Sequence, residues 1–197
     1  MNDELSDRQN DIINATIELI GEKGVQGLTI KLLAERVGVS EPALYRHFDS
    51  KQDILLAVLN RFEENTKRMF ALAAASGKTG IEQIETVYMH HFKTFSERPS
   101  VAAIIFSADY FIEDKRLASQ VISIMKNTET NLIRIIESGG KKEFRTDIPK
   151  KELAVILMGS LRLLVTRWRL TDYGFDLVRQ GKTLWKALKK CITDKPG

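Results

Sequence analysis

Residues 27–51, "GLTIKLLAERVGVSEPALYRHFDSK", contain three possible helix starts and one tight turn. Apolar residues recur at helical spacing on both sides of "VGV" at residues 37–39, where a glycine can provide the turn. Thr29, Ser40 and Ser50 each stand where a hydroxyl can cap a helix by accepting a bond from a free backbone amide. The stretch therefore predicts a helix from Thr29 through Arg36, a second from Ser40 to about His47, and a long helix from Ser50.

An amphipathic segment precedes this stretch. Its apolar residues Ile12, Ile13, Leu19 and Ile20 form one stripe, and "GEKG" at residues 21–24 is a good terminator. Three short helices with a glycine turn between the second and the third have the arrangement of a helix-turn-helix, whose last helix enters the major groove of DNA. Any small three-helix bundle needs similar turns, so spacing alone leaves both interpretations open.

The third helix has two different faces. At about 100° per residue, Leu44 and Phe48 share one side, and Arg46 points away from it. Tyr45 and His47 lie on either side of Arg46. A helix in a DNA groove needs a polar outer face and polar flanks toward the two phosphate walls, and this distribution fits that need.

The bulk composition is that of a globular protein without covalent cross-links. The chain has 197 residues, of which 43% are hydrophobic and 28% charged, and Cys191 is its single cysteine. The first residues are acidic, unlike a signal peptide, and no apolar run reaches the roughly 20 residues that span a bilayer. We expect a cytoplasmic protein that spans no membrane and has no metal site or cofactor.

The charge is unevenly distributed along the chain. Residues 1–53 hold six Lys or Arg against ten Asp or Glu, a net charge of −4, although the whole chain carries +4. A DNA-binding segment with this balance must rely on a few well-placed cations. Bulk charge is therefore no evidence for DNA binding here.

The stretch "TIKLLAERVGVSEPALYRHFDSKQDILLAVL" resembles the N-terminal domain of the TetR family of bacterial transcriptional regulators, and the resemblance covers about residues 8–60. It implies phosphate contacts from Thr29, Tyr45, His47 and Lys51, and contacts to base edges near Glu41, Pro42 and Ala43. Together with the helix faces, it predicts a DNA interface formed by Thr29, Ser40, Glu41, Pro42, Ala43, Tyr45, Arg46, His47 and Lys51.

Alternatives stay open for single residues of this interface. Tyr45 could belong partly to the core, and His47 could be an ordinary surface histidine. Glu41 could accept a hydrogen bond from cytosine at a base edge, or it could simply favour the positive end of the helix.

The rest of the chain is also patterned as helices, over about residues 79–96, 99–108, 114–138, 149–171 and 175–193. We predict an all-α fold of about nine helices. A helix-turn-helix DNA-binding domain would occupy residues 1–53, with its boundary inside the fourth helix, and a larger dimerisation and effector-binding domain would occupy residues 54–197.

The last two predicted helices favour self-association. The helix over 149–171 is apolar nearly all round, so both of its sides need cover, one from its own domain and one from a second copy. The family resemblance implies the same four-helix interface. The predicted interface residues are Leu153, Ile156, Leu157, Gly159, Leu164, Trp168, Leu184, Trp185 and Leu188.

Aromatic residues gather in the middle of the second domain. They predict a pocket for a small apolar or aromatic effector, lined by Tyr88, His91, Phe92, Phe95, Phe106, Tyr110 and Met125. The alternative is an aromatic core in which His91 is hydrogen-bonded. His90 and His91 point about 100° apart on a helix and do not form a metal site together.

Two functions compete within the same family. The first is a homodimeric repressor that binds a palindromic operator and is released by an effector. The C-terminal half, with "ERPSVAAIIF" and "GSLRLLVTRWRL", also has a weak similarity to the branch that contains the nucleoid-occlusion factor of enteric bacteria, which acts on cell division through a protein partner. The chain has no nucleophile elbow, phosphate-binding loop or HExxH motif, and no enzymatic activity is predicted.

Overall fold

Hydroxyl caps start the first helices of the computed structural model, which describes residues 5–107 and 111–193. The helix α1 (Asp7–Lys23) begins with a capping box between Ser6 and Gln9. In α2 (Ile30–Val37) the Thr29 hydroxyl accepts from the Leu32 amide at 3.2 Å. In α3 (Glu41–Tyr45) the Ser40 hydroxyl accepts from the Ala43 amide at 3.3 Å. The caps predicted at Thr29 and Ser40 are confirmed.

The helix α3 ends earlier than the sequence pattern predicts. Its last helical residue is Tyr45, and Arg46 and His47 continue as a turn in which the His47 amide donates to the Leu44 carbonyl at 3.0 Å. A helix of five residues leaves little backbone to support itself, so its position depends on what it packs against.

Ser50 and Asp53 start the long helix α4 (Lys51–Ala74) as predicted. The Ser50 hydroxyl accepts from the Asp53 amide at 3.2 Å and donates to the Asp53 carboxylate. The remaining helices are α5 (Gly80–Glu97), α6 (Pro99–Ile105), α8 (Lys115–Gly139), the 3-10 helix η1 (Gly140–Lys142), α9 (Lys150–Leu170) and α10 (Leu177–Ile192).

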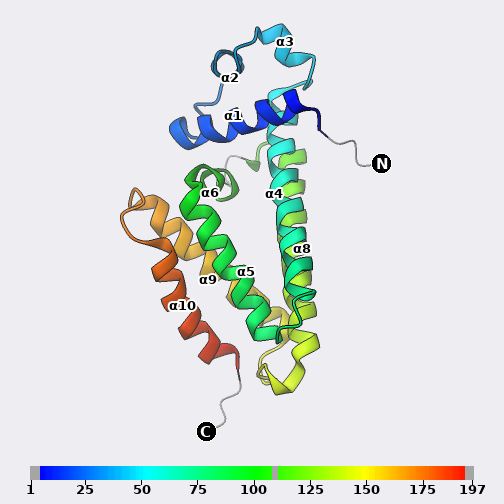
Figure 1. Ribbon diagram of the computed structural model, residues 1–197, viewed down its shortest axis with the longest axis vertical. Coiled ribbons are helices and arrows are strands. Elements are labelled where there is room, and N and C mark those ends of the chain that lie inside the picture. Colours follow the sequence, from blue (N-terminus) through cyan, green and yellow to red (C-terminus); the bar gives the residue numbers. More distant parts are fainter. Residues whose placement is uncertain (1–4, 108–110, 194–197) are drawn as a thin grey trace. The chain divides into compact units, whose positions relative to one another are not determined.

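The described residues form helices, turns and loops and contain no β-strand, which confirms the predicted all-α fold. Within the same residues, no helix combines the length and the apolar character that crossing a membrane requires. Figure 1 shows the course of the helices along the chain.

The chain folds into two compact units. The first comprises the described residues of 1–63 and 99–122. In it, α1 lies between α2 on one side and α6 on the other (Figure 1). The approach to α6 is close, since a Cβ atom at Gly21 would lie 2.6 Å from the Cβ of Ser100. The core of this unit includes Ile12, Ile20, Leu33, Leu44, Ile54 and Ala102.

The second unit comprises the described residues of 64–98 and 123–197. In it, α5 packs against α10 and α9 (Figure 1). Gly181 of α10 lies directly on the ring of Phe92, and a Cβ atom there would collide with the ring. The Tyr88 hydroxyl donates to the Leu157 carbonyl and so joins α5 to α9.

The units divide α4 after Glu63 and group residues 99–122 with the first unit. The domain boundary predicted from the sequence, after residue 53, stays a prediction about where an independent DNA-binding domain would end.

Candidate nucleic-acid interface

The helix α3 is anchored by two apolar side chains. Leu44 is fully buried and Phe48, just after the helix, is nearly so. The opposite side faces solvent. Tyr45 is 45% exposed, Glu41 and Pro42 at the helix start are exposed, and Ala43 is half-buried. Arg46 and His47 are exposed as well. The division into a buried and a polar face therefore agrees with the sequence prediction.

Neighbouring helices fix the end of this segment. Gln9 of α1 donates from its side-chain amide to the His47 carbonyl at 3.2 Å, which ties the turn after α3 to α1. Arg61 of α4 donates to the side-chain oxygens of Asn10 and Asn14 at 2.5 and 2.7 Å. These contacts hold α1 on α4, and sequence patterns did not reveal them because amide side chains carry no periodic signal.

The turn between α2 and α3 depends on Gly38. Its φ of 75° and ψ of 36° are left-handed values, which glycine adopts without steric cost. Its amide donates to the Glu35 carbonyl at 3.3 Å. The turn thereby sets the angle at which α3 leaves α2, as a helix-turn-helix requires.

The start of α4 meets the segment just before α2. The Lys51 ammonium donates to the Leu28 carbonyl at 2.5 Å, and Leu28 directly precedes the cap Thr29. Two helix N-termini, each with free backbone amides and a positive dipole end, are therefore close together. Such a pair can bind two phosphates of one DNA strand.

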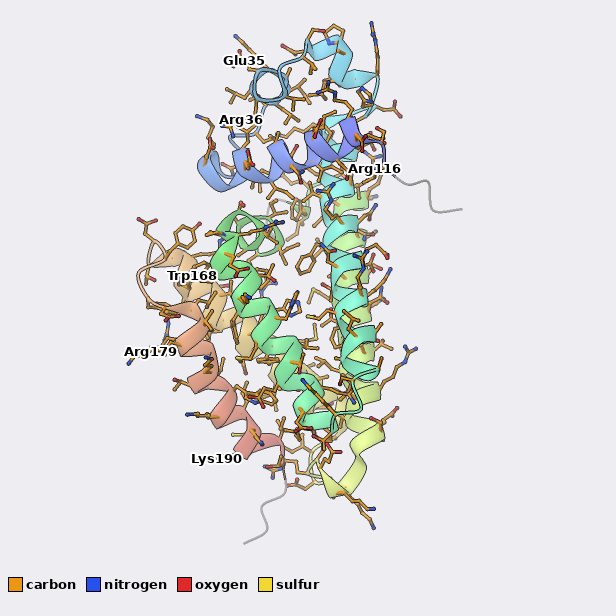
Figure 2. The ribbon with its side chains drawn as sticks, viewed as in Figure 1. Glu35, Arg36, Arg116, Trp168, Arg179 and Lys190 are labelled. Atoms are coloured by element: carbon orange, nitrogen blue, oxygen red, sulfur yellow. The ribbon has the colours of Figure 1, made fainter. Side chains whose placement is uncertain are left out.

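Several acids of the first unit are neutralised inside the unit. The Arg36 guanidinium lies 2.7 Å from Glu22 and 3.6 Å from Glu18, and this links α2 to α1 (Figure 2). The Glu22 pKa is lowered by its hydrogen bond with Arg36. Arg36 therefore joins two helices of this unit and balances the charge of two acids of α1.

Asp53 near the start of α4 is also balanced. Arg116 of α8, which is labelled in Figure 2, donates to its carboxylate at 2.8 Å. The Asp53 pKa is lowered by its hydrogen bond with Ser50 and, after that, by Arg116. The positive charge of Arg116 therefore offsets the negative charge of Asp53 at this helix end.

In the second unit, the predicted effector residues of α5 are packed against their neighbours. The Tyr88 ring lies 5.4 Å from Trp185 and 5.9 Å from Phe92, measured between centroids. His91 is half-buried, its Nδ1 lies 2.9 Å from the Val87 carbonyl, and its ring lies 5.8 Å from Phe95. Burial lowers the pKa of His91 to about 4, against the opposing effect of the Val87 hydrogen bond.

The other predicted effector residues lie elsewhere. Met125 is 46% exposed on α8, and Phe106 is half-buried in the first unit. Tyr110 lies outside the described residues. The structure thus brings together Tyr88 with Phe92 and His91 with Phe95. Tyr88 also lies against Trp185, whose indole N–H is buried and finds no hydrogen-bond partner among the described residues.

The residues predicted for self-association fall into two groups. Within a single chain, buried side chains belong to Leu153, Leu157, Leu164, Trp168, Trp185 and Leu188. Leu184 is half-buried. Ile156 is 41% exposed, and Gly159 has open space around it.

The exposed side of α9 includes apolar residues that the sequence analysis did not single out. Val155 is 55% exposed, Leu163 71% and Leu170 83%. With Ile156 and Gly159 they form one stripe along α9, since their spacing follows the helical repeat. We refer to these five residues as the α9 stripe. A helix that is apolar all round gives no sequence signal for which side its own chain leaves uncovered.

Two family profiles match the chain. The profile of bacterial regulatory proteins of the tetR family matches residues 12–58. The profile of the C-terminal region of YsiA-like proteins matches residues 58–191.

Proteins similar to this chain include a nucleoid occlusion factor and two regulators named FadR. The nucleoid occlusion factor SlmA of Vibrio campbellii is 26% identical over 95% of this chain and 96% of its own length. The fatty acid degradation regulator FadR of Bacillus halodurans has a similar fold, with a TM-score of 0.82 at 20% identity over 95% of this chain and 97% of that one. FadR of Bacillus subtilis, solved with stearoyl-CoA, has a TM-score of 0.76 at 22% identity over 92% and 97% of the two chains.

Proposed function

Because the chain belongs to the TetR family of DNA-binding transcriptional regulators, we propose that it is a homodimeric repressor in the cytoplasm that binds a palindromic operator and is released by a small-molecule effector. The observation that carries the proposal is the placement of α3, whose polar side is exposed to solvent while Leu44 and Phe48 anchor its other side.

We assign the DNA contacts by their position on this face. Tyr45 and His47 flank the exposed side and would bond phosphates, while Glu41, Pro42 and Ala43 would reach base edges with Arg46 beside them. Thr29, Ser40 and Lys51 stand at the helix N-termini, where backbone amides favour phosphate. The bond from Lys51 to the Leu28 carbonyl holds the ammonium close to that site.

We assign dimerisation to the α9 stripe. Its apolar side chains face solvent in the single chain, and burial against a second copy would stabilise association by about 25 cal/mol for each Å² of apolar surface removed from water. Gly159 would permit close approach of the two α9 helices. A two-fold dimer would place two α3 helices about 34–36 Å apart, in successive major grooves.

The effector is assigned to the aromatic cluster of Tyr88, His91, Phe92 and Phe95. An occupant that accepts a hydrogen bond would satisfy the unpartnered Trp185 indole N–H. Since Gly181 lies directly on Phe92, entry requires α10 to move away from α5. An effector that binds this opened form preferentially would increase the fraction of dimers in that conformation. The opened dimer would then bind the operator more weakly.

A second function has support from the comparisons. The match to SlmA covers 95% of this chain, so a nucleoid-occlusion role that acts on cell division through a protein partner is the alternative. A repressor should occupy a few promoters, whereas an occlusion factor should occupy many dispersed sites.

Sequencing of genomic fragments bound by the purified protein tests both functions. We expect a small set of palindromic sites upstream of genes. The control is a Tyr45→Ala, Arg46→Ala double variant, which keeps the buried anchors of α3 and should lose the enrichment. Equal recovery of all fragments by both proteins would disprove sequence-specific binding. If the protein instead bound many sites scattered along the genome, the nucleoid-occlusion role would be favoured over the repressor.

A further inference from the structure

A surface groove in the second unit has the composition of a ligand site. It has a volume of about 720 Å³ and is formed by α4, α5 and α8 within that unit. This volume lies within the roughly 300–1,000 Å³ typical of sites for small molecules. The groove is distinct from the aromatic cluster, because none of Tyr88, His91, Phe92 and Phe95 lines it, and its only α5 residue is Gln83.

The groove has an apolar base. Phe70 of α4 and Ile135 of α8 line it and are nearly fully buried, so they form its floor. Ala71 of α4 lines it as well and is exposed, and its small side chain keeps that side of the groove open.

The rim of the groove is polar and cationic. Arg134, Asn131 and Thr130 of α8 lie along it, with Lys67 of α4 opposite. None of the described residues that line the groove is acidic. Lys67 is already bonded to Glu64 at 2.9 Å, but Arg134 is exposed and no acid among the described residues pairs with it. A guanidinium is the group best suited to bind a carboxylate, phosphate or sulfonate through two parallel hydrogen bonds.

Hydrogen-bonding groups beside Arg134 remain available to a ligand. One N–H of the Asn131 amide donates to the Asn127 carbonyl at 2.9 Å, which fixes the side chain and leaves its oxygen and second N–H for an occupant. The Thr130 hydroxyl, one residue earlier, is exposed on the same rim.

We propose that this groove binds an organic anion, with its charged group on Arg134 and its apolar part over Phe70 and Ile135. The proposal goes beyond the effector assigned to the aromatic cluster, and it concerns binding alone. It therefore stands or fails independently of whether the protein binds an operator.

The test measures probe binding by fluorescence with the full-length protein. The probe is 8-anilinonaphthalene-1-sulfonate, an aromatic anion, and its uncharged counterpart is N-phenyl-1-naphthylamine. We expect Arg134→Gln to weaken binding of the sulfonate about tenfold, since a hydrogen bond to a charged group is lost, and to leave the uncharged probe unchanged. Lys186→Gln, which removes an exposed cation of α10, should change neither.

A steric variant tests the location without removing charge. Ala71→Trp should fill the groove and weaken both probes, while Leu72→Trp, at an exposed neighbouring position that does not line the groove, should not. Both positions are exposed, so the fold should tolerate the substitutions. Sulfonate binding that is unchanged in Arg134→Gln and in Ala71→Trp would overturn the proposal.

Competition identifies the chemical group that the site prefers. Octanoate and octyl phosphate should displace the sulfonate probe at lower concentrations than 1-octanol, which has the same chain and no charge. Displacement by either anion supports the proposal and names the headgroup. If 1-octanol were as effective as both anions, the site would be a simple apolar surface and the assignment of Arg134 would be wrong.

Discussion

The exposed side of α3 and the α9 stripe are both uncovered faces of helices, but their chemistry is opposite. Around α3 the exposed residues Glu41, Tyr45 and Arg46 carry polar groups, and the large apolar side chains of Leu44 and Phe48 are buried. Along α9 the exposed residues include Leu163 and Leu170, although the inner face is apolar too. Exposing the polar side of α3 to water costs little free energy, whereas exposing the apolar α9 stripe costs much more. This difference is the reason why we propose DNA as the partner of α3 and a second copy of the chain as the partner of α9.

The largest expected effect comes from making the two faces alike. Ile156→Glu combined with Leu163→Glu places charges in the α9 stripe and should weaken self-association more than about 100-fold, since burial of an unpaired charge costs several kcal/mol. Sedimentation velocity at micromolar concentration measures the change. Lys182→Glu on the exposed side of α10 is the control and should sediment like the wild type. A double variant with the wild-type sedimentation coefficient would exclude the α9 stripe as the interface.

A second prediction concerns the interior of the second unit, in contrast to the exposed faces of α3 and α9. The pKa of His91 is lowered to about 4, against an ordinary value near 6.5. Between these pH values the His91 imidazole is protonated in the unfolded chain and neutral in the folded one. This contribution to the free energy of unfolding is complete above pH 6.5 and is lost as the pH falls toward 4. We expect a loss of about 1–3 kcal/mol, measured by urea unfolding at several pH values.

His90 provides the matched control for this effect. It is exposed, so His90→Asn should keep the pH dependence of the wild type, whereas His91→Asn should reduce it. Identical slopes for the two variants between pH 4 and 6.5 would show that His91 is not shielded from solvent.

The proposed DNA interface next to this polar face can be tested through Lys51, at the start of α4. Lys51→Ala should lower the affinity for all DNA sequences about tenfold and reduce the dependence of log K on log salt by about one, because a phosphate contact carries no sequence information. Filter binding or fluorescence anisotropy at several salt concentrations measures both. Lys23→Ala, in the last turn of α1, is the control for simple loss of charge. An unchanged salt dependence in Lys51→Ala would mean that Lys51 does not contact a DNA phosphate.

The smallest expected effect concerns Glu41. Glu41→Gln should change the preferred base at one operator position by about fivefold, close to the lower limit for a base-edge contact. Selection from a randomised operator library measures this preference. A uniform rise in affinity for all sequences would instead mean that Glu41 only favours the helix N-terminus and repels phosphate.

Local chemistry explains why most helices could be predicted from the sequence. Thr29, Ser40 and Ser50 act on amides three residues away, so their role can be read without knowledge of the fold. The faces of α3 follow from its periodicity in the same way. These features predict the helices of the first unit without any information on contacts between distant residues.

The remaining features depend on contacts between residues far apart in the chain. Two hydrogen bonds join positions about sixty residues apart, Arg116 with Asp53 and Gln120 with Glu63. No sequence pattern predicts such pairs. The burial of Leu157 and the exposure of Leu163 on one apolar helix also depend on where α5 and α10 pack. For the same reason the cationic groove at Arg134, formed by three helices, could not be predicted.

The continuity of α4 and α8 has a mechanical consequence. The chain passes between the two units within α4 after Glu63, at Arg98–Pro99, and within α8 after Ile122. Neither α4 nor α8 contains proline, and the single glycine of α8 is its last residue, Gly139. Sharp kinks in helices usually need proline, glycine or a bulge, so neither crossing inside a helix has a built-in hinge. The chain therefore crosses between the units twice inside an unbroken helix, and a sharp bend at either crossing would disrupt backbone hydrogen bonds of that helix.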